Sequence, residues 1–209
     1  MVFPPLYAIV DVDVAARASW APRDLARAYL AGGARLLQLR AKALASGAFL
    51  DLASAIAEDV RIADAVLIVN DRADLAVLSR SSGVHVGQDD LSPAQVRLVV
   101  GSEAIVGFST HSDAQIAQAV AEPITYLAVG PVFGSTTKNT GYRQVGLPLV
   151  ATAAAAAGPR GLPVVAIGGI TLGTAPSVIA AGATSIAVIT DLLDRDPESR
   201  VRRYLSALA

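Results

Sequence analysis

Short apolar runs rich in Val, Ile and Leu recur along the whole chain, and this repetition constrains the fold more than any other feature. The runs occupy residues 6–10, 35–39, 65–69, 83–86, 104–108, 125–129, 163–167 and 184–189. Each run is short and shows little polar alternation, as in parallel strands that are buried on both faces. The sequence therefore predicts eight parallel strands.

Amphipathic segments with helix signals separate the runs. Pro22, Pro93 and Pro197 stand near the starts of three such segments, where proline is favoured because its missing amide hydrogen costs nothing. Gly33 and Gly182 stand where helices are expected to end. Eight strands alternating with eight helices, in units of about 26 residues, favour an α/β fold: a single (β/α)8 TIM barrel over residues 1–209. An open doubly wound sheet is the alternative.

Composition narrows the class of protein. The 209 residues are 53% hydrophobic and 17% charged, which excludes an intrinsically disordered chain. The net charge of −1 gives no basic excess for general nucleic-acid binding, and the absence of cysteine excludes disulfides and a thiolate nucleophile. Signal-peptide features and apolar runs long enough for a membrane span are also missing. We therefore expect a cytoplasmic protein without nucleic-acid or membrane partners, while a homo-oligomer stays open.

Polar side chains follow the second run at every other position. Gln38, Arg40 and Lys42 have the period of a strand, so they are expected to point the same way, toward the barrel axis and its mouth. The active site of a barrel lies where the strands end. Two cations on one face of a strand end suit a bound anion. The alternative is that both side chains are only solvated.

Carboxylates follow the next two runs. Asp71 comes after Asn70 at the end of the third run, and Asp89 and Asp90 follow the fourth. Adjacent parallel strands end side by side, so Asp71 is expected near Asp89 or Asp90. Two carboxylates beside an amide suit Mg²⁺, which takes oxygen ligands from one or two protein carboxylates and from substrate phosphate. The alternative is that one Asp caps the following helix.

Three further loops have the features of an anion site. The loop over residues 130–141, after the sixth run, is small, hydroxyl-rich and basic. Gly168 and Gly169 follow the seventh run, Ile189 and Thr190 stand at the end of the eighth, and each pair leads toward a helix. Loops after the seventh and eighth strands form the recurrent phosphate site of TIM barrels.

The two histidines are less informative. His85 lies within an apolar run, so we expect it to be a packed or supporting residue rather than a catalyst. His111 follows the fifth run near the mouth, where it either contacts a ligand or caps a helix. A Ser/His/Asp triad has no support from nucleophile-elbow spacing.

Taken in chain order, these motifs resemble the thiamine phosphate synthase family, from the first strand to the eighth. The motifs are Gln-x-Arg-x-Lys, Val-Asn-Asp, His-x-Gly-Gln-x-Asp, the serine after the fifth run, Gly-Pro-x-Phe…Ser-x-Thr-Lys and Gly-Gly-Ile. The resemblance implies a Mg²⁺-dependent transferase of thiamine biosynthesis that acts on phosphorylated small molecules. Such an enzyme condenses 4-amino-2-methyl-5-hydroxymethylpyrimidine diphosphate with hydroxyethylthiazole phosphate, giving thiamine phosphate and pyrophosphate.

The resemblance also implies roles for individual residues. The Mg²⁺ ligands fall on Asp71 and Asp90. Catalytic contacts fall on Arg40, Lys42, Ser109 and Lys138. The substrate-binding set is Gln38, Arg40, Lys42, Asn70, Ser109, Ser135, Thr137, Lys138, Gly169, Ile189 and Thr190.

Some positions depart from the family pattern. Ala41 stands where the family usually has Glu, which removes an acid that could orient the neighbouring cations. Gly134 and Ser135 replace the usual Pro-Thr, and Thr190 replaces a Ser.

Two other functions stay open. Thiazole tautomerases share the fold, but they tend to have a histidine where this chain has Pro131, which cannot transfer a proton. A non-catalytic phosphate-binding or regulatory barrel is the third possibility, although such a protein should lose part of the metal-binding and cationic set.

Overall fold

The computed structural model describes residues 3–134 and 143–209, and in it eight parallel strands pair in sequence order into a closed barrel. Pairing of β1 (Leu6–Asp11) with β8 (Ser185–Val188) closes the sheet. The other strands are β2 (Leu36–Arg40), β3 (Val66–Asn70), β4 (Gly83–Val86), β5 (Ile105–Thr110), β6 (Tyr126–Val129) and β7 (Val164–Ile167). The predicted TIM barrel is therefore confirmed, and the open sheet is wrong.

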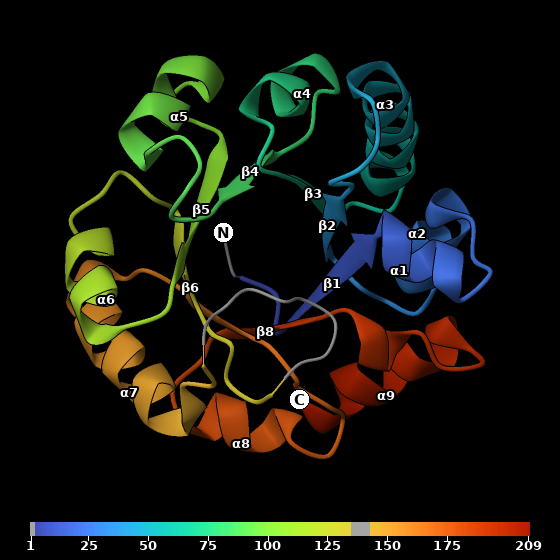
Figure 1. The fold of residues 1–209 in the computed structure, drawn as a ribbon. Coiled ribbons are helices and arrows are strands. Elements are labelled where there is room, and N and C mark those ends of the chain that lie inside the picture. Colours follow the sequence, from blue (N-terminus) through green and yellow to red (C-terminus); the bar gives the residue numbers. More distant parts are fainter. Residues whose placement is uncertain (1–2, 135–142) are drawn as a thin grey trace.

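Helices surround the strands in chain order (Figure 1). The α-helices are α1 (Val12–Arg17), α2 (Pro22–Ala31), α3 (Ser46–Ile62), α4 (Ala73–Leu78), α5 (Pro93–Val100), α6 (Asp113–Ala119), α7 (Gly146–Ala157), α8 (Ala175–Ala180) and α9 (Pro197–Ala207). Two 3-10 turns, η1 (Gly158–Arg160) and η2 (Thr190–Leu192), complete the elements of the described residues. Among these helices, none is both long and apolar enough to cross a membrane.

One helix was not expected. The sequence predicted eight helices, but α1 follows β1 directly and precedes α2. It forms because the Asp11 side chain accepts a hydrogen bond from the Val14 amide at 3.0 Å and so caps the first turn. The segment is too short and too weakly periodic to stand out in the sequence.

The predicted helix boundaries agree with the structure where their signals are strong. Ser92 and Gln95 form a reciprocal capping box at the start of α5, and the Asp196 side chain caps α9 by accepting from the Ser199 amide. Gly33 and Gly182 have φ angles of 102° and 105°, a left-handed conformation that glycine adopts without strain.

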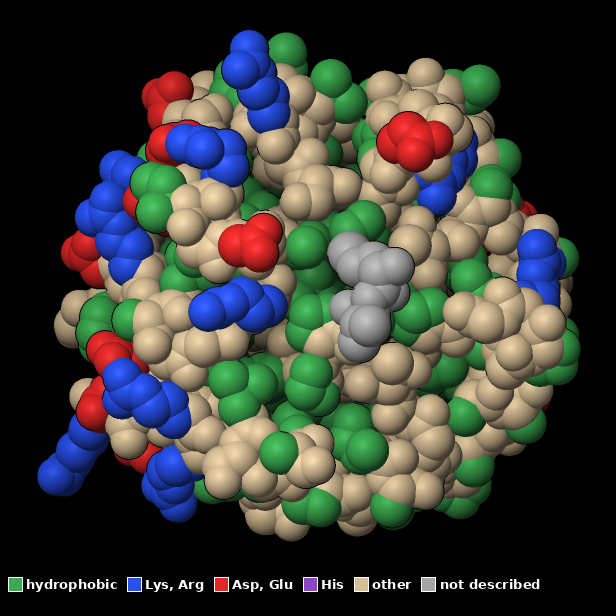
Figure 2. Space-filling model, turned by 180° about the vertical axis from the view of Figure 1, so that it is seen from behind, with side chains coloured by type: hydrophobic (Ala, Val, Ile, Leu, Met, Phe, Trp, Pro, Cys, Tyr) green, Lys and Arg blue, Asp and Glu red, His purple; other side chains and the backbone are tan. Residues whose placement is uncertain are grey.

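Charged side chains of both signs share the protein surface. On the face seen in Figure 2, Lys and Arg side chains lie interspersed with Asp and Glu side chains, mostly along the left edge. This distribution accords with the net charge of −1.

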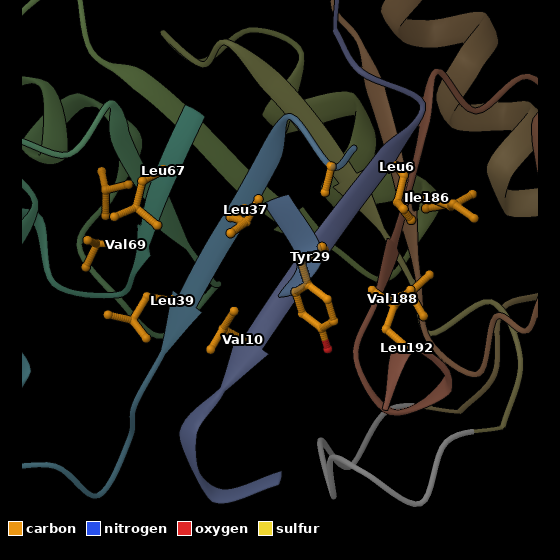
Figure 3. Close-up of a cluster of buried hydrophobic side chains, with 14 of the residues drawn as sticks. Leu6, Val10, Tyr29, Leu37, Leu39, Leu67, Val69, Ile186, Val188 and Leu192 are labelled. Carbon is orange, nitrogen blue, oxygen red and sulfur yellow. The ribbon is translucent and has the colours of Figure 1, made fainter. Parts of the chain in front are cut away.

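The apolar core has two layers because side chains alternate along each strand. One set points outward and packs under the helices, as Figure 3 shows for Leu37, Leu39 and Val10 near Tyr29 of α2. The other set fills the barrel interior and includes Ile9. Side chains of this inner set pack inside the barrel, and several of them, including Ile9, also line the cavity that opens at the carboxyl ends of the strands.

Three strands run one residue further than the apolar runs predicted. Asp11, Arg40 and Asn70 are the last residues of β1, β2 and β3. Asp11 pairs in register with Arg40, so the polar residues continue the ladder. Their side chains point toward the barrel axis and therefore lie at the end of the barrel interior.

Tyr29 has a buried hydroxyl that finds no hydrogen-bond partner among the described residues. Its side chain is 0% exposed on the inner face of α2. Tyr204 of α9 is equally buried, but its hydroxyl donates a hydrogen bond to Asp191. The buried hydroxyl of Tyr204 therefore has a hydrogen-bond partner, whereas that of Tyr29 has none among the described residues.

We expect Tyr29→Phe to raise the free energy of unfolding by about 1 kcal/mol, because it removes an unpaired buried hydroxyl and keeps the ring. Urea denaturation of the variant and the wild type measures the change. Tyr204→Phe is the matched control and should lower the free energy of unfolding, because it removes a satisfied hydrogen bond. A loss of stability in both variants would contradict the assignment.

Candidate active site

A cavity of about 1540 Å³ lies at the carboxyl ends of the strands, and all eight strands contribute to its walls. Residues expected from the sequence that line it are Gln38, Arg40, Lys42, Asn70, Asp71, Asp90, Ser109, Gly169, Ile189 and Thr190. Ser135, Thr137 and Lys138 lie outside the described residues. The volume exceeds the roughly 300–1,000 Å³ of a typical site for one small molecule.

Arg40 is held at the cavity wall by Asp11. Their side chains form an ion pair in which Arg40 Nη1 donates to Asp11 Oδ2, and the side chains are only 14% and 2% exposed. A buried pair of this kind fixes the guanidinium in one place. Asp11 is not among the residues predicted for the site, although it directly follows the first apolar run, whose strand is expected beside that of Arg40.

Lys42 and two carboxylates form the next part of the wall. Lys42 Nζ lies 3.6 Å from Asp71 Oδ2, and Asp71 is within hydrogen-bonding reach of Asp90. Burial and the neighbouring charge of Asp90 raise the pKa of Asp71, while Lys42 and Arg40 act in the opposite direction. The expected approach of Asp71 to one of the two following acids is thus found, with Asp90 as the partner.

Helix capping does not account for Asp71. The N-cap position of α4 is Arg72, and no side chain caps that helix. Asp71 instead has a φ of 64°, a left-handed conformation that Asp and Asn tolerate better than most residues. Its amide donates to the carbonyl of His85 on the neighbouring strand at 2.8 Å.

The residues around Asp71 fit a hard divalent cation. Two carboxylates that face each other repel, and a bound cation relieves that repulsion. Over residues 3–134 and 143–209, no group of three or more His, Cys, Asp and Glu side chains could hold a metal. Mg²⁺ commonly needs only one or two protein carboxylates, because waters and substrate phosphate supply the other oxygens. The donor set of Asp71 and Asp90 therefore suits Mg²⁺.

Glycines allow the loops after β6 and β7 to pack closely at the other side of the cavity. The amides of Val132 and Phe133 donate to the carbonyls of Ile167 and Gly168, each at 2.9 Å. A Cβ on Gly168 would lie 2.5 Å from Pro131, so a larger residue does not fit. This close approach, together with a φ of 106°, explains why glycine stands there.

The predicted helix start behind these loops differs from the structure. The helix α8 begins only at Ala175, several residues beyond Gly169, whereas the turn η2 begins directly at Thr190. A three-residue 3-10 turn thus lies close behind β8, whereas the α-helices after β7 and β8 begin only at Ala175 and Pro197.

Asp191 connects the loops after β7 and β8 to α9. Its Oδ2 atom accepts from the Leu172 amide at 3.1 Å, from Arg200 at 2.7 Å and from the Tyr204 hydroxyl. These three donors compensate the charge of the carboxylate, which lines the same cavity as Gly169.

Deeper in the cavity, four consecutive hydrogen bonds connect side chains of five strands. Gln38 Nε2 donates to the Tyr7 hydroxyl at 2.9 Å, and the Tyr7 and Tyr126 hydroxyls are 3.1 Å apart. His85 Nδ1 lies 2.9 Å from the Tyr126 hydroxyl, and His85 Nε2 lies 2.8 Å from Ser109 Oγ. We call this row of five hydrogen-bonded side chains the interior chain.

Tyr7 and Tyr126 are not among the residues predicted for the site. Their signal was a hydroxyl-bearing ring in an otherwise apolar run, which must find a buried partner. The His85 ring is stacked on Tyr126 and hydrogen-bonded at both nitrogens, as expected for a packed residue, and it also lines the cavity.

His111 also lines the cavity. Its Nδ1 atom lies 2.6 Å from the carbonyl oxygen of Gly130. The N-cap of α6 is Ser112, so His111 is not the cap.

Fold and site together define a class of protein: a TIM-barrel enzyme whose mouth combines paired carboxylates, cations and glycine-lined loops for phosphorylated small molecules. The sequence model of one such family, described as thiamine monophosphate synthase, matches residues 6–192. The chain belongs to this family, and the predicted resemblance is confirmed.

Individual relatives agree with that assignment. The thiamine-phosphate synthase of Koribacter versatilis (strain Ellin345) is 44% identical, covering 98% of this chain and 96% of that protein. The thiamine-phosphate synthase of Roseiflexus castenholzii (strain DSM 13941 / HLO8) is 40% identical, covering 98% of this chain and 88% of that protein. Thiamine phosphate pyrophosphorylase from Pyrococcus furiosus has a similar structure, with a TM-score of 0.87 at 26% identity, covering 98% of this chain and 95% of that chain.

The raised pKa of Asp71 leads to a prediction for the metal-free protein. The folded state binds the proton more tightly than the unfolded state, so ionising Asp71 lowers stability as the pH rises through its raised pKa. We expect Asp71→Asn to be more stable than the wild type at pH 7, and this difference to disappear at a pH below the pKa of an exposed Asp. Thermal unfolding in the presence of a chelator, as a function of pH, measures it.

Asp89→Asn is the matched control for this experiment. It removes a carboxylate from an exposed position in the same loop as Asp90, without touching the close pair. The same gain in both variants would show that general charge at the mouth, rather than the pair, lowers stability.

Proposed function

We propose that the chain condenses 4-amino-2-methyl-5-hydroxymethylpyrimidine diphosphate with hydroxyethylthiazole phosphate, giving thiamine phosphate and releasing pyrophosphate. Membership of the thiamine monophosphate synthase family supports this reaction. The observation that carries the proposal is one cavity with a carboxylate pair and two cations on one side and glycine-lined loops on the other. Such a cavity would offer separate places for two phosphorylated substrates.

The diphosphate is proposed to bind at the ends of β2, β3 and β4. Arg40 and Lys42 would contact its oxygens, and Asp71 and Asp90 would hold Mg²⁺ beside them. Bound there, the ion would act as a Lewis acid toward the diphosphate oxygens. Gln38, Asn70 and Ser109 are proposed to hold the pyrimidine.

The thiazole phosphate is proposed to bind at the loops after β7 and β8. Backbone amides at Gly169, Ile189 and Thr190 would bind its oxygens, because amides at such loops suit a phosphate. The pairing of Asp191 with Arg200 and the Leu172 amide supports this placement, since an unpaired carboxylate there would repel the anion.

In the proposed reaction, the bond between the pyrimidine methylene carbon and the diphosphate oxygen breaks, and its electron pair leaves with pyrophosphate. The aminopyrimidine ring stabilises the resulting cation. The lone pair of the thiazole nitrogen then forms the new bond to the methylene carbon. Arg40 and Lys42 would stabilise the charge that grows on the leaving group, and the cavity walls would align the nitrogen and exclude water.

The other two functions have less support. A thiazole tautomerase would need a group that transfers protons, whereas Pro131 offers none and packs against Gly168. A non-catalytic barrel would have no need for both the carboxylate pair and the cations at the mouth.

Incubation of the protein with both substrates and Mg²⁺ tests the proposal directly. We expect thiamine phosphate and pyrophosphate to form in equal amounts, and the reaction to stop after chelation. Binding of both substrates without release of pyrophosphate would support the non-catalytic barrel instead. Product formation after complete chelation would exclude the role given to Mg²⁺.

We expect Asp71→Asn to lower turnover by at least about 100-fold, because a Lewis-acid metal contributes several kcal/mol. Asparagine tolerates the left-handed backbone at this position, so the fold should be retained. Steady-state kinetics at saturating Mg²⁺ measure the effect, with Asp89→Asn as the control that keeps the close pair. Turnover equal to that of the wild type would exclude Asp71 as a metal ligand.

We expect Lys138→Ala to lower kcat by roughly 10- to 1,000-fold, the range for loss of one preorganised electrostatic contact. The charge should matter most as pyrophosphate departs, so kcat and kcat/KM should fall together. Binding of the diphosphate should change much less, because Arg40 and Lys42 remain. A normal kcat with weaker binding alone would make Lys138 a tether for the ground state.

A further inference from the structure

The first hydrogen bond of the interior chain has a fixed donor and a fixed acceptor. The Gln38 amide nitrogen has only hydrogens to give, so the Tyr7 hydroxyl accepts at that end. Each hydroxyl in the interior chain carries a single hydrogen. The positions of the remaining hydrogens can therefore be assigned one after another.

Tyr7 accepts from Gln38, and the Tyr126 oxygen, 3.1 Å away, is the one acceptor among the described residues for the buried Tyr7 hydrogen, so this hydrogen goes to Tyr126. Tyr126 in turn gives its hydrogen to His85 Nδ1 at 2.9 Å. This nitrogen must then be an unprotonated acceptor, which leaves the hydrogen of a neutral imidazole on Nε2. That hydrogen is donated to Ser109 Oγ at 2.8 Å.

We propose that the interior chain holds His85 in the Nε2–H tautomer and thereby leaves the Ser109 hydroxyl hydrogen available to a ligand. The opposite tautomer would use that hydrogen up on His85 Nε2, so Ser109 could only accept. The arrangement thus selects ligands that present a hydrogen-bond acceptor at this point, such as the bare ring nitrogen of a heteroaromatic base. This inference deepens the proposed function and rests on it for the identity of that base.

Burial supports a fixed direction. Tyr7 and Tyr126 are 1% and 0% exposed, and Gln38 is 3% exposed, so water does not compete for these groups. Burial also raises the pKa of both phenols, which stay neutral and keep their hydrogens. Reversal would require every bond to turn at once, together with the amide of Gln38.

Packing holds the aromatic members in place. The rings of His85 and Tyr126 stack with centroids 5.6 Å apart, and the rings of Tyr7 and Tyr126 meet edge to face at 6.0 Å. Gly107 on β5 leaves the space for this ring, since a Cβ there would lie 2.0 Å from Tyr126 Cζ. Glycine inside a strand generally weakens that strand, so the space that the Tyr126 ring needs explains why glycine stands at position 107.

These contacts make Tyr7, Tyr126 and His85 positioning residues that act through Ser109, and Gln38, which is also proposed to hold the pyrimidine, sets their direction. A positioning role differs from a merely structural one in its effect on the tautomer of His85. The chain contains two histidines, so the spectrum of the imidazole nitrogens is simple, and a His111→Gln variant assigns it.

The ¹⁵N NMR spectrum of the ligand-free protein tests the tautomer. We expect His85 to show a pyridine-like Nδ1 and a protonated, pyrrole-like Nε2 near neutral pH. A protonated Nδ1, either alone or together with Nε2, would overturn the proposal. This measurement uses no substrate, so it stands or fails independently of the proposed reaction.

Tyr7→Phe tests whether direction is transmitted from Gln38. The variant keeps the ring but breaks the interior chain, after which Tyr126 can either donate to His85 Nδ1 or accept from it. We expect the two nitrogen signals of His85 to move toward each other as both tautomers become populated. An unchanged tautomer would show that Tyr126 alone sets it, and would overturn the role of Gln38 and Tyr7.

Gln38→Glu tests the same point from the far end. A carboxylate can only accept, so Tyr7 should turn toward it and the following bonds should reverse. We expect His85 to switch toward the Nδ1–H tautomer. Retention of the Nε2–H tautomer in a folded, ionised variant would contradict the proposal, and Tyr7→Phe remains the test should this variant not fold.

Kinetics add a readout under the proposed function. We expect Tyr7→Phe to raise KM for the pyrimidine diphosphate about tenfold, the order of one hydrogen bond, with a smaller effect on kcat. Tyr29→Phe, a buried tyrosine outside the interior chain, should leave both constants unchanged. Equal effects of the two substitutions would point to a general loss of packing instead of a directed contact.

Discussion

Pairing of β1 with both β2 and β8 closes the sheet, and the polar contacts of the cavity depend on that closure. A closed barrel turns alternate side chains of all its strands toward one interior. Tyr7 on β1 can therefore meet Tyr126 on β6 at 3.1 Å, across 119 positions of the sequence. The same geometry puts Asp11 beside Arg40 in register. Rigid strands carry these groups, whereas the carboxylates of Asp71 and Asp90 lie in the loops that follow β3 and β4.

Three cations at or beside the cavity are each paired with a carboxylate of the protein. Arg40 pairs with Asp11, Lys42 with Asp71 and Arg200 with Asp191. The first and third cations are mostly buried, with side chains 14% and 15% exposed, so each needs its carboxylate. Lys42 is 60% exposed and 3.6 Å from its partner, so this pair exchanges partners most easily. An arriving diphosphate would thus meet one mobile cation and one fixed cation.

Much of the fold was predictable because apolar runs mark buried strands and their number favours closure. The alternation at Gln38, Arg40 and Lys42 also predicted a shared face, since the strand period is two. Contacts between distant strands were not predictable in this way: nothing local in the sequence pairs Tyr7 with Tyr126. The choice between Asp89 and Asp90 as the partner of Asp71 likewise depends on loop geometry, which period and composition do not determine. For Asp71, a sequence pattern gives no sign of the left-handed backbone that directs it away from the helix cap.

The cavity is graded from a neutral interior to a charged mouth, and this gradient would orient a ligand without further contacts. Deep positions are occupied by uncharged groups, with Tyr7 and Gln38 only 1% and 3% exposed. The cations and the carboxylate pair lie at the strand ends, where Lys42 reaches solvent. A diphosphate would lose its hydration at the bottom of the cavity with no cation to compensate, which is costly. An uncharged base loses little there and gains hydrogen bonds. A molecule with a base at one end and a diphosphate at the other would therefore enter base first.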